Sequence, residues 1–271
     1  MKPSLMLSLG ATLCTASASY AGGVCDVKSG RATAALVELY TSEGCSSCPP
    51  ADRQLSNLRR QLDADAIVVP LALHVSYWDR IGWKDVFAQR IFDARQRALL
   101  EKRHNKVAYT PQFFVNGTEL RDWSTALPAE IRRTNAIPAP LTISLKSTAV
   151  NPAPTTAAGA TLLLESDVAA ADPRTAGALY LALSESGLVS HVLRGENGGA
   201  TLRHDDTVRL WLGPFPLAQG KTHVRQEIRL PAAWRSERVQ AVAFVQSADD
   251  ARILQALSTA QCQAATSARS L

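Results

Sequence analysis

Apolar and polar positions follow different patterns in the two halves of the chain. In the first half, residues 34–41 form an apolar, β-prone run that ends in a turn signal at 42–44. Residues 66–75 are almost continuously apolar, as in a strand that is covered on both faces. Apolar residues at helical spacing lie between these runs and predict a helix that starts at Cys48. The order strand, helix, strand predicts a parallel pair of buried strands.

The first half continues with two helices and one more strand. The pattern predicts a long amphipathic helix over about 85–104, a strand within 109–117 that closes in an Asn-Gly hairpin turn, and a helix over 124–134. Two prolines among residues 137–140 stop both helix and sheet, so this segment is predicted to be a linker. Residues 31–136 are therefore expected to form one α/β domain.

The second half consists of short strand-like runs that are separated by Gly, Pro, Asn and Asp turns. This pattern predicts a mainly antiparallel, β-sandwich-like domain over residues 141–262. Residues 151–159 are expected to form a mobile hairpin loop between two of its strands. The predicted strand runs are 141–145, 160–164, 178–183, 208–212, 223–230 and 239–245.

Residues 1–21 have the features of a secretory signal peptide. One lysine precedes an apolar stretch that is too short to span a bilayer, and small residues at Ser19 and Ala21 predict cleavage after Ala21. We expect a periplasmic or secreted product, and no later segment has the pattern of a membrane span. Cleavage removes Lys2 and no acid, so Lys plus Arg falls from 29 to 28 against 24 Asp plus Glu, a net charge of +4. Without a basic run, this charge argues against nucleic-acid binding.

The residues with the clearest potential for chemistry are Cys45 and Cys48. They form a Cys-x-x-Cys motif between a buried strand and the start of a helix. Two intervening residues bring the sulfurs close enough to form a disulfide, and the N–H groups and dipole of a helix start stabilise a thiolate on the first cysteine. Cys45 is therefore predicted to be the attacking thiol and Cys48 the resolving thiol. A Glu43 carboxylate near Cys45 would oppose thiolate formation.

The order strand, Cys-x-x-C, helix, strand, long helix and Thr110-Pro111 before a further strand resembles the thioredoxin superfamily. The resemblance implies that Pro111 is a cis proline which lies against the dithiol and shapes a peptide-binding surface. It also implies that Thr110 offers backbone hydrogen bonds to a substrate. The chain departs from thioredoxins in having Ser-Ser rather than Gly-Pro within the motif, and no Trp before it. Redox potential and choice of partner are therefore not carried over.

Longer motifs resemble a secreted bacterial family of uncharacterised activity, known as domain of unknown function 1223. They are Gly-Cys-Ser-Ser-Cys-Pro-Pro-Ala-Asp at 44–52, His-Val-Ser-Tyr-Trp-Asp at 74–79, Gly-Trp-Lys-Asp at 82–85 and Thr-Pro-Gln-Phe-Phe-Val-Asn-Gly at 110–117. The stretch 195–209, in the second half, also resembles this family. The resemblance supports a fold more than an activity.

The expected activity is thiol–disulfide exchange with protein or small-molecule thiols and disulfides, without a cofactor. Tyr77, Trp78 and Trp83 are predicted either to form an apolar wall for a substrate beside Cys45 or to cap the sheet. The alternative from another class is a non-enzymatic binding or adaptor protein in which the dithiol is a structural disulfide. The sequence indicates no direction of electron transfer and no oligomeric state.

A copper-binding alternative involves His74, which closes the second strand at the same sheet edge as the dithiol. Cys45, Cys48 and His74 would form a soft site that suits Cu(I), as in copper-delivery members of the same superfamily. A hydrogen-bonded structural histidine is favoured over this ligand role, and no other metal site is predicted.

Cys25 and Cys262 lie near the two ends of the exported chain. They are predicted to form a structural disulfide, because chain ends often approach each other and the compartment is oxidising. The second-half histidines have spacings unlike any metal motif, and His204 is predicted to lie in a turn. These histidines are His191, His204 and His223.

Overall fold

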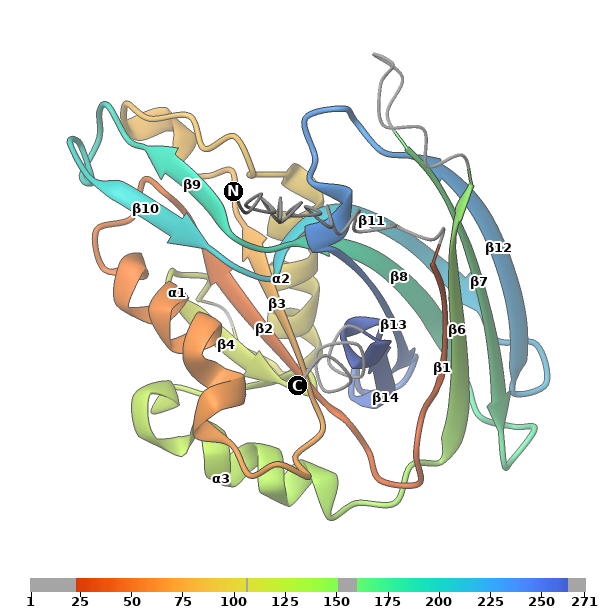
Figure 1. The fold of residues 1–271 in the computed structure, drawn as a ribbon. Helices are drawn as coiled ribbons and strands as arrows, with labels where there is room; N and C mark the ends of the chain where they lie inside the picture. The colour runs from red at the N-terminus through yellow and green to blue at the C-terminus, as the bar shows by residue number, and fades with distance from the viewer. Residues whose placement is uncertain (1–22, 106, 151–159, 263–271) are drawn as a thin grey trace, which may run out of the picture.

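The computed structural model describes residues 23–105, 107–150 and 160–262 (Figure 1). The predicted signal peptide at 1–21 and the predicted loop at 151–159 lie outside the described residues. Within the described part, no helix is both long enough and apolar enough to cross a membrane.

The first half contains three α-helices and five strands among its described residues. Helix α1 begins at Cys48, as predicted, whereas α2 begins at Arg90 rather than near Asp85. The backbone is still extended at Gln89, the residue before α2, and the Asp85 carboxylate accepts hydrogen bonds from the backbone N–H groups of Glu43 and Phe87 in the preceding loop. In chain order the elements are β1 (Val24–Lys28), β2 (Ala35–Thr41), α1 (Cys48–Asn57), β3 (Val68–His74), α2 (Arg90–Lys102), β4 (Gln112–Val115), β5 (Thr118–Glu119) and α3 (Trp123–Asn135).

The second half is built from strands, and each of the six predicted runs overlaps one of them. The sequence pattern did not predict the two short strands β9 and β10, nor the last strand, β14. The strands are β6 (Leu141–Val150), β7 (Thr161–Ala170), β8 (Gly177–Glu185), β9 (Leu188–His191), β10 (Thr201–His204), β11 (Thr207–Pro216), β12 (Lys221–Arg229), β13 (Val239–Ser247) and β14 (Ile253–Ser258).

One eight-stranded sheet runs through both halves, in the order β14-β13-β8-β11-β3-β2-β4-β5. Strands β2 and β3 are parallel, as predicted, and β4 is antiparallel to β2. The two halves meet where β11 pairs in parallel with β3, with Thr207 opposite Ala72. The antiparallel strands of the second half are therefore divided between this sheet and a four-stranded sheet, β1-β6-β7-β12, while β9 and β10 pair only with each other.

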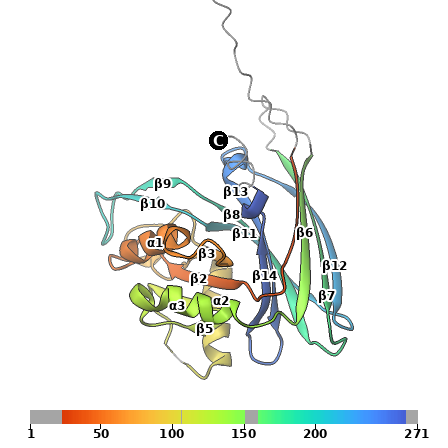
Figure 2. The same cartoon turned by 60° about the horizontal axis from the view of Figure 1, so that its bottom comes forward.

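Three buried apolar clusters lie between the layers. Helices α1 and α3 cover one face of β2, β3 and β4 with residues such as Leu55 and Ile131. Helix α2 covers the opposite face, and its cluster includes Trp211 and Phe244 from the second half. The third cluster joins the four-stranded sheet to β8, β13 and β14, on the side away from the helices (Figure 2).

A buried ion pair fixes α2 to β2 next to the junction between the halves. The Arg95 guanidinium binds the Glu38 carboxylate of β2 through two nitrogens, one of them at 3.0 Å. Its Cζ also lies 4.7 Å from the centre of the Trp211 ring, a cation–π contact. Glu38 has no exposed surface, so the positive charge of Arg95 is needed to offset the cost of burying its carboxylate.

Candidate active site

The dithiol lies at the turn between β2 and α1 as a disulfide, with an S–S distance of 2.08 Å. The backbone of Cys45 donates to the Ser42 carbonyl, and that of Cys48 donates to the Cys45 carbonyl, so the turn is closed before α1 begins. Prolines at the start of α1 remove N–H donors from its first turn, which leaves fewer groups to stabilise a thiolate than the motif alone suggests. Neither cysteine has exposed surface.

Pro111 lies near the same edge of the sheet as the dithiol. Gln112 of β4 pairs with Tyr40 of β2, so the residue before β4 faces the end of β2, where the dithiol turn starts. The Thr110–Pro111 peptide bond is cis. Thr110 and Pro111 are both half-buried.

The three aromatic residues of the loop after β3 are half-buried and contact different partners. The indole N–H of Trp83 donates to Oε2 of Glu43 at 2.7 Å. Trp78 packs so closely on Gly44 that a Cβ added there would lie 3.3 Å from the Trp78 Cβ. The Tyr77 hydroxyl donates to Gln96 of α2 at 3.3 Å, and burial raises the pKa of Tyr77 to about 12. Trp83 and Trp78 therefore hold the dithiol turn, while Tyr77 faces α2.

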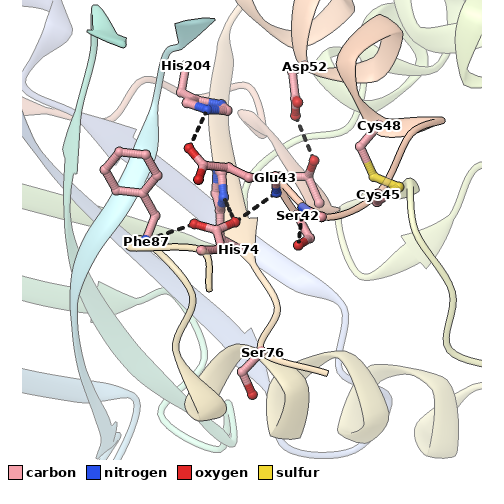
Figure 3. A network of polar contacts seen from close by, with 12 residues as sticks. Ser42, Glu43, Cys45, Cys48, Asp52, His74, Ser76, Phe87 and His204 are labelled. Carbon is pink, nitrogen blue, oxygen red and sulfur yellow. Dashed lines mark hydrogen bonds and ion pairs between the residues drawn. A yellow bond between two sulfur atoms is a disulfide. The ribbon is translucent and has the colours of Figure 1, made fainter. Parts of the chain in front are cut away.

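A buried polar network lies next to the dithiol turn (Figure 3). Nδ1 of His74 lies 2.7 Å from Oδ2 of Asp85, which also accepts the Glu43 N–H at 2.9 Å. Burial alone would lower the pKa of His74, but the Asp85 carboxylate outweighs it and the net pKa is raised. Burial likewise opposes ionisation of Asp85, yet His74 holds its pKa below the usual value. His74 is thus a hydrogen-bonded histidine whose other ring nitrogen, Nε2, is buried without a protein partner.

Two further carboxylates complete this network. Oε1 of Glu43 lies 3.1 Å from Nε2 of His204, which comes from β10 in the second half. Asp52, in α1, accepts a hydrogen bond from the Thr41 hydroxyl at 2.8 Å. Burial raises the pKa of Asp52, although His204 and His74 partly offset this effect. With Trp83 and His204 as partners, the Glu43 carboxylate is held by hydrogen bonds rather than left free beside Cys45.

A loop of the second half also contacts the dithiol turn. Oε2 of Glu196 accepts the Ser46 N–H at 2.9 Å. The Asn197 side-chain amide donates to the carbonyl oxygens of Glu43 and Cys45 at 2.8 and 2.9 Å. The site therefore includes residues from both halves of the chain.

Sequence reasoning missed Glu196, Asn197 and His204 as site residues. His204 was predicted to lie in a turn, whereas it ends β10 and is 2% exposed. The similarity of residues 195–209 to the family motif was the one available signal, since it marked this stretch without giving it a role.

The copper alternative finds no support in this geometry. Cys45 and Cys48 are bonded to each other, and one nitrogen of His74 is engaged by Asp85. Across the described ranges, no group of three or more His, Cys, Asp or Glu side chains is arranged to hold a metal ion.

A second disulfide joins Cys25 to Cys262, which ties β1 to the end of the described chain.

Fold and site together define a mostly β protein with three described α-helices and a disulfide-bonded Cys-x-x-C at the start of the first helix. The chain belongs to the family described as protein of unknown function DUF1223, which it matches over residues 36–246. This match confirms the family that the motifs predicted. No curated protein matches the chain.

Two solved structures are similar to the chain. Protein AGR_C_4864 from Agrobacterium tumefaciens has a TM-score of 0.57 and 23% identity, over 85% of this chain and 95% of that one. HBP35 of Porphyromonas gingivalis has a TM-score of 0.62 and 17% identity, over 84% of this chain and 75% of that one. At these identities the similarity concerns the fold alone.

Proposed function

We propose that this protein is an exported thiol–disulfide oxidoreductase that uses the Cys45–Cys48 pair. The observation that carries the proposal is the position of this pair, at the turn between a buried parallel strand and the first residue of a helix. We further propose that residues 31–136 form a thioredoxin-like unit and that residues 141–262 form a sandwich-like unit which shares its sheet. Export follows from the signal peptide predicted at 1–21 and fits an oxidised dithiol.

In the proposed reaction the protein accepts two electrons from a dithiol substrate. A substrate thiolate attacks Sγ of Cys45, the Cys45–Cys48 bond breaks, and Cys48 leaves as a thiolate that takes up a proton. The second substrate thiol then loses its proton and attacks the mixed disulfide, which releases Cys45. The products are a substrate disulfide and the reduced pair, and the reverse sequence reduces a substrate disulfide.

The residues around the pair support this assignment with distinct roles. Pro111 and Thr110, next to the end of β2, would shape the surface that receives the substrate chain. Trp83 and Trp78 would orient the dithiol turn, since both contact its residues 43–44. Tyr77 faces α2, so we propose no direct substrate contact for it.

One observation favours the alternative of a non-enzymatic binding protein with a structural disulfide. An exchange site needs an accessible sulfur, and neither Cys45 nor Cys48 has exposed surface. The two functions differ in what they require of this disulfide. Exchange requires that the sulfurs become accessible and easily reduced, whereas a structural bridge stays buried and resists mild reductant.

The test is the reduction potential of the pair in a glutathione series, together with trapping by Cys48→Ser. A potential of roughly −120 to −270 mV, with a mixed disulfide trapped on Cys45, is expected for an exchange enzyme. A potential below roughly −300 mV without any trapped species would overturn the proposal and support the structural role. The Cys25→Ser/Cys262→Ser background keeps the second disulfide from contributing to the signal.

A further inference from the structure

The β9–β10 ribbon (residues 188–204) is the outer part of the hairpin that joins β8 to β11. Its two strands pair only with each other, with Thr201 opposite His191 and His204 opposite Leu188. It projects beyond the large sheet beside α1 (Figure 1). Among the described residues, β9 and β10 share no ladder of strand hydrogen bonds with the other two sheets. The ribbon can therefore move without breaking hydrogen bonds of those sheets.

Side chains from the ribbon satisfy backbone groups on both sides of Cys45. Glu196 accepts from the Ser46 N–H, and Asn197 donates to the Cys45 and Glu43 carbonyls. At its base, His204 binds the Glu43 carboxylate. A backbone N–H and C=O that flank a reactive cysteine are the groups with which an extended substrate chain would pair. The ribbon thus occupies these groups in the oxidised protein.

The part of the ribbon that contacts the dithiol turn has a defined shape. Backbone hydrogen bonds join Gly198 to Gly195, Gly199 to Val192 and Ala200 to Asn197. Gly195 has a φ of 77°, and a Cβ added there would lie 3.2 Å from the Cβ of Trp83. This preformed loop fits against the aromatic loop as a cover with fixed contacts.

The base of the ribbon is a tight turn of the backbone, where the Gly187 carbonyl accepts a hydrogen bond from Arg238. Gly187 precedes β9 with a φ of 68°, and its N–H is held by the Asp205 carboxylate at 2.8 Å. Both ends of the ribbon therefore meet at one point, where a glycine allows the backbone to change direction.

We propose that the β9–β10 ribbon is a gate that closes the Cys45–Cys48 disulfide, and that a partner opens it by replacing the contacts of Glu196 and Asn197 with its own main chain. This inference rests on the proposed function, because a gate matters only where the dithiol reacts. The partner is an extended polypeptide segment that carries a thiol or a disulfide. The gate reconciles a buried disulfide with an exchange activity.

The experiment measures how fast dithiothreitol reduces Cys45–Cys48 in the oxidised full-length exported protein, by quenching, alkylation and peptide mass analysis. The Glu196→Ala/Asn197→Ala variant is expected to be reduced at least about tenfold faster, since three hydrogen bonds that close the gate are lost. Glu196→Gln keeps an acceptor oxygen and should remain close to the wild-type rate. Arg203→Ala is the matched control, because Arg203 lies on β10 with its side chain exposed, next to the buried His204.

The Cys25–Cys262 disulfide serves as an internal reference in the same samples. A specific increase at Cys45–Cys48, with the reference rate unchanged, supports the gate. Equal rates in wild type and double variant would overturn it, and so would a parallel increase at both disulfides, which reports general unfolding. This assay needs no physiological partner. If the gate opens as expected and Cys48→Ser still traps nothing, the exchange function fails while the ribbon remains a cover.

Discussion

His204 and Glu43 are 161 positions apart in the chain, yet Nε2 of the imidazole lies 3.1 Å from Oε1 of the carboxylate in a site closed to solvent. Glu43 lies two positions before Cys45, and His204 ends the ribbon whose loop contacts the dithiol turn. The contact therefore links the position of the β9–β10 ribbon to the position of the dithiol turn. It also explains how a carboxylate is accommodated next to Cys45.

Replacement of His204 by alanine is expected to destabilise the protein by about 1 to 3 kcal/mol, because buried Glu43 loses one of its two side-chain partners. Urea denaturation followed by circular dichroism measures the change in the free energy of unfolding. His223→Ala is the control, since its pair with Asp167 lies on the surface and should contribute within about 0.5 kcal/mol. Equal effects of the two substitutions would contradict the role given to His204.

Arg95→Ala should destabilise the protein more than removal of a surface arginine does. It leaves Glu38 buried without its cation and removes the cation–π contact with Trp211, so a loss of about 3 to 5 kcal/mol is expected. Arg133→Ala is the control, because that arginine is 73% exposed in its ion pair with Glu130 and should leave stability nearly unchanged. A shift in the urea midpoint no larger than that of the control would show that the junction between the halves does not depend on Arg95.

The carboxyl of Asp206 should make stability depend on pH. Burial raises its pKa from 3.8 to about 6, although Arg59 partly offsets the shift. The folded state binds this proton more tightly than the unfolded chain, so the stabilisation is complete below pH 3.8 and is lost as the pH rises through about 6. Asp206→Asn cannot ionise and should lack this decline.

Thermal unfolding of wild type and Asp206→Asn between pH 4 and about 8 measures the difference. Asp63→Asn, at a side chain that is 65% exposed, should follow the wild-type curve. Parallel curves for wild type and Asp206→Asn would exclude Asp206 as the responsible group.

The disulfide between Cys25 and Cys262 should contribute more to stability than to activity. It closes a loop with a sequence separation of 237 residues, and the chain-entropy argument gives a loss of roughly 5 to 6 kcal/mol for Cys25→Ser/Cys262→Ser. The potential of the Cys45–Cys48 pair should be the same in this variant. A shifted potential in the folded variant would show that the two disulfides are coupled, and an unchanged free energy of unfolding in urea would contradict the stabilising role.

Local patterns predicted much of the first half. The apolar run before Ser42, the two prolines after Cys48 and the continuous apolar strand before Val75 placed β2, α1 and β3 within a few residues. Such features depend on near neighbours in the chain, and for that reason a single sequence displays them.

The rest depends on contacts between distant residues. Strand β11 pairs with β3 through Thr207 and Ala72, and nothing in either run marks the other as its partner. Glu196 and Asn197 look like ordinary turn residues until the fold brings them to Ser46 and Cys45. Polar residues in a glycine-rich stretch are common in ordinary turns as well as in functional sites. The sequence pattern alone therefore did not show that Glu196 and Asn197 belong to the site.

The shared sheet also affects how this protein can be divided. A fragment that ended at the linker, residues 137–140, would keep β3 without its neighbour β11 and would lose Trp211 and Phe244 from the apolar surface under α2. Unpaired strand edges and uncovered apolar surface are the usual causes of aggregation. The two halves are thus joined by more than a peptide link, and neither is a part that could be moved to another protein unchanged.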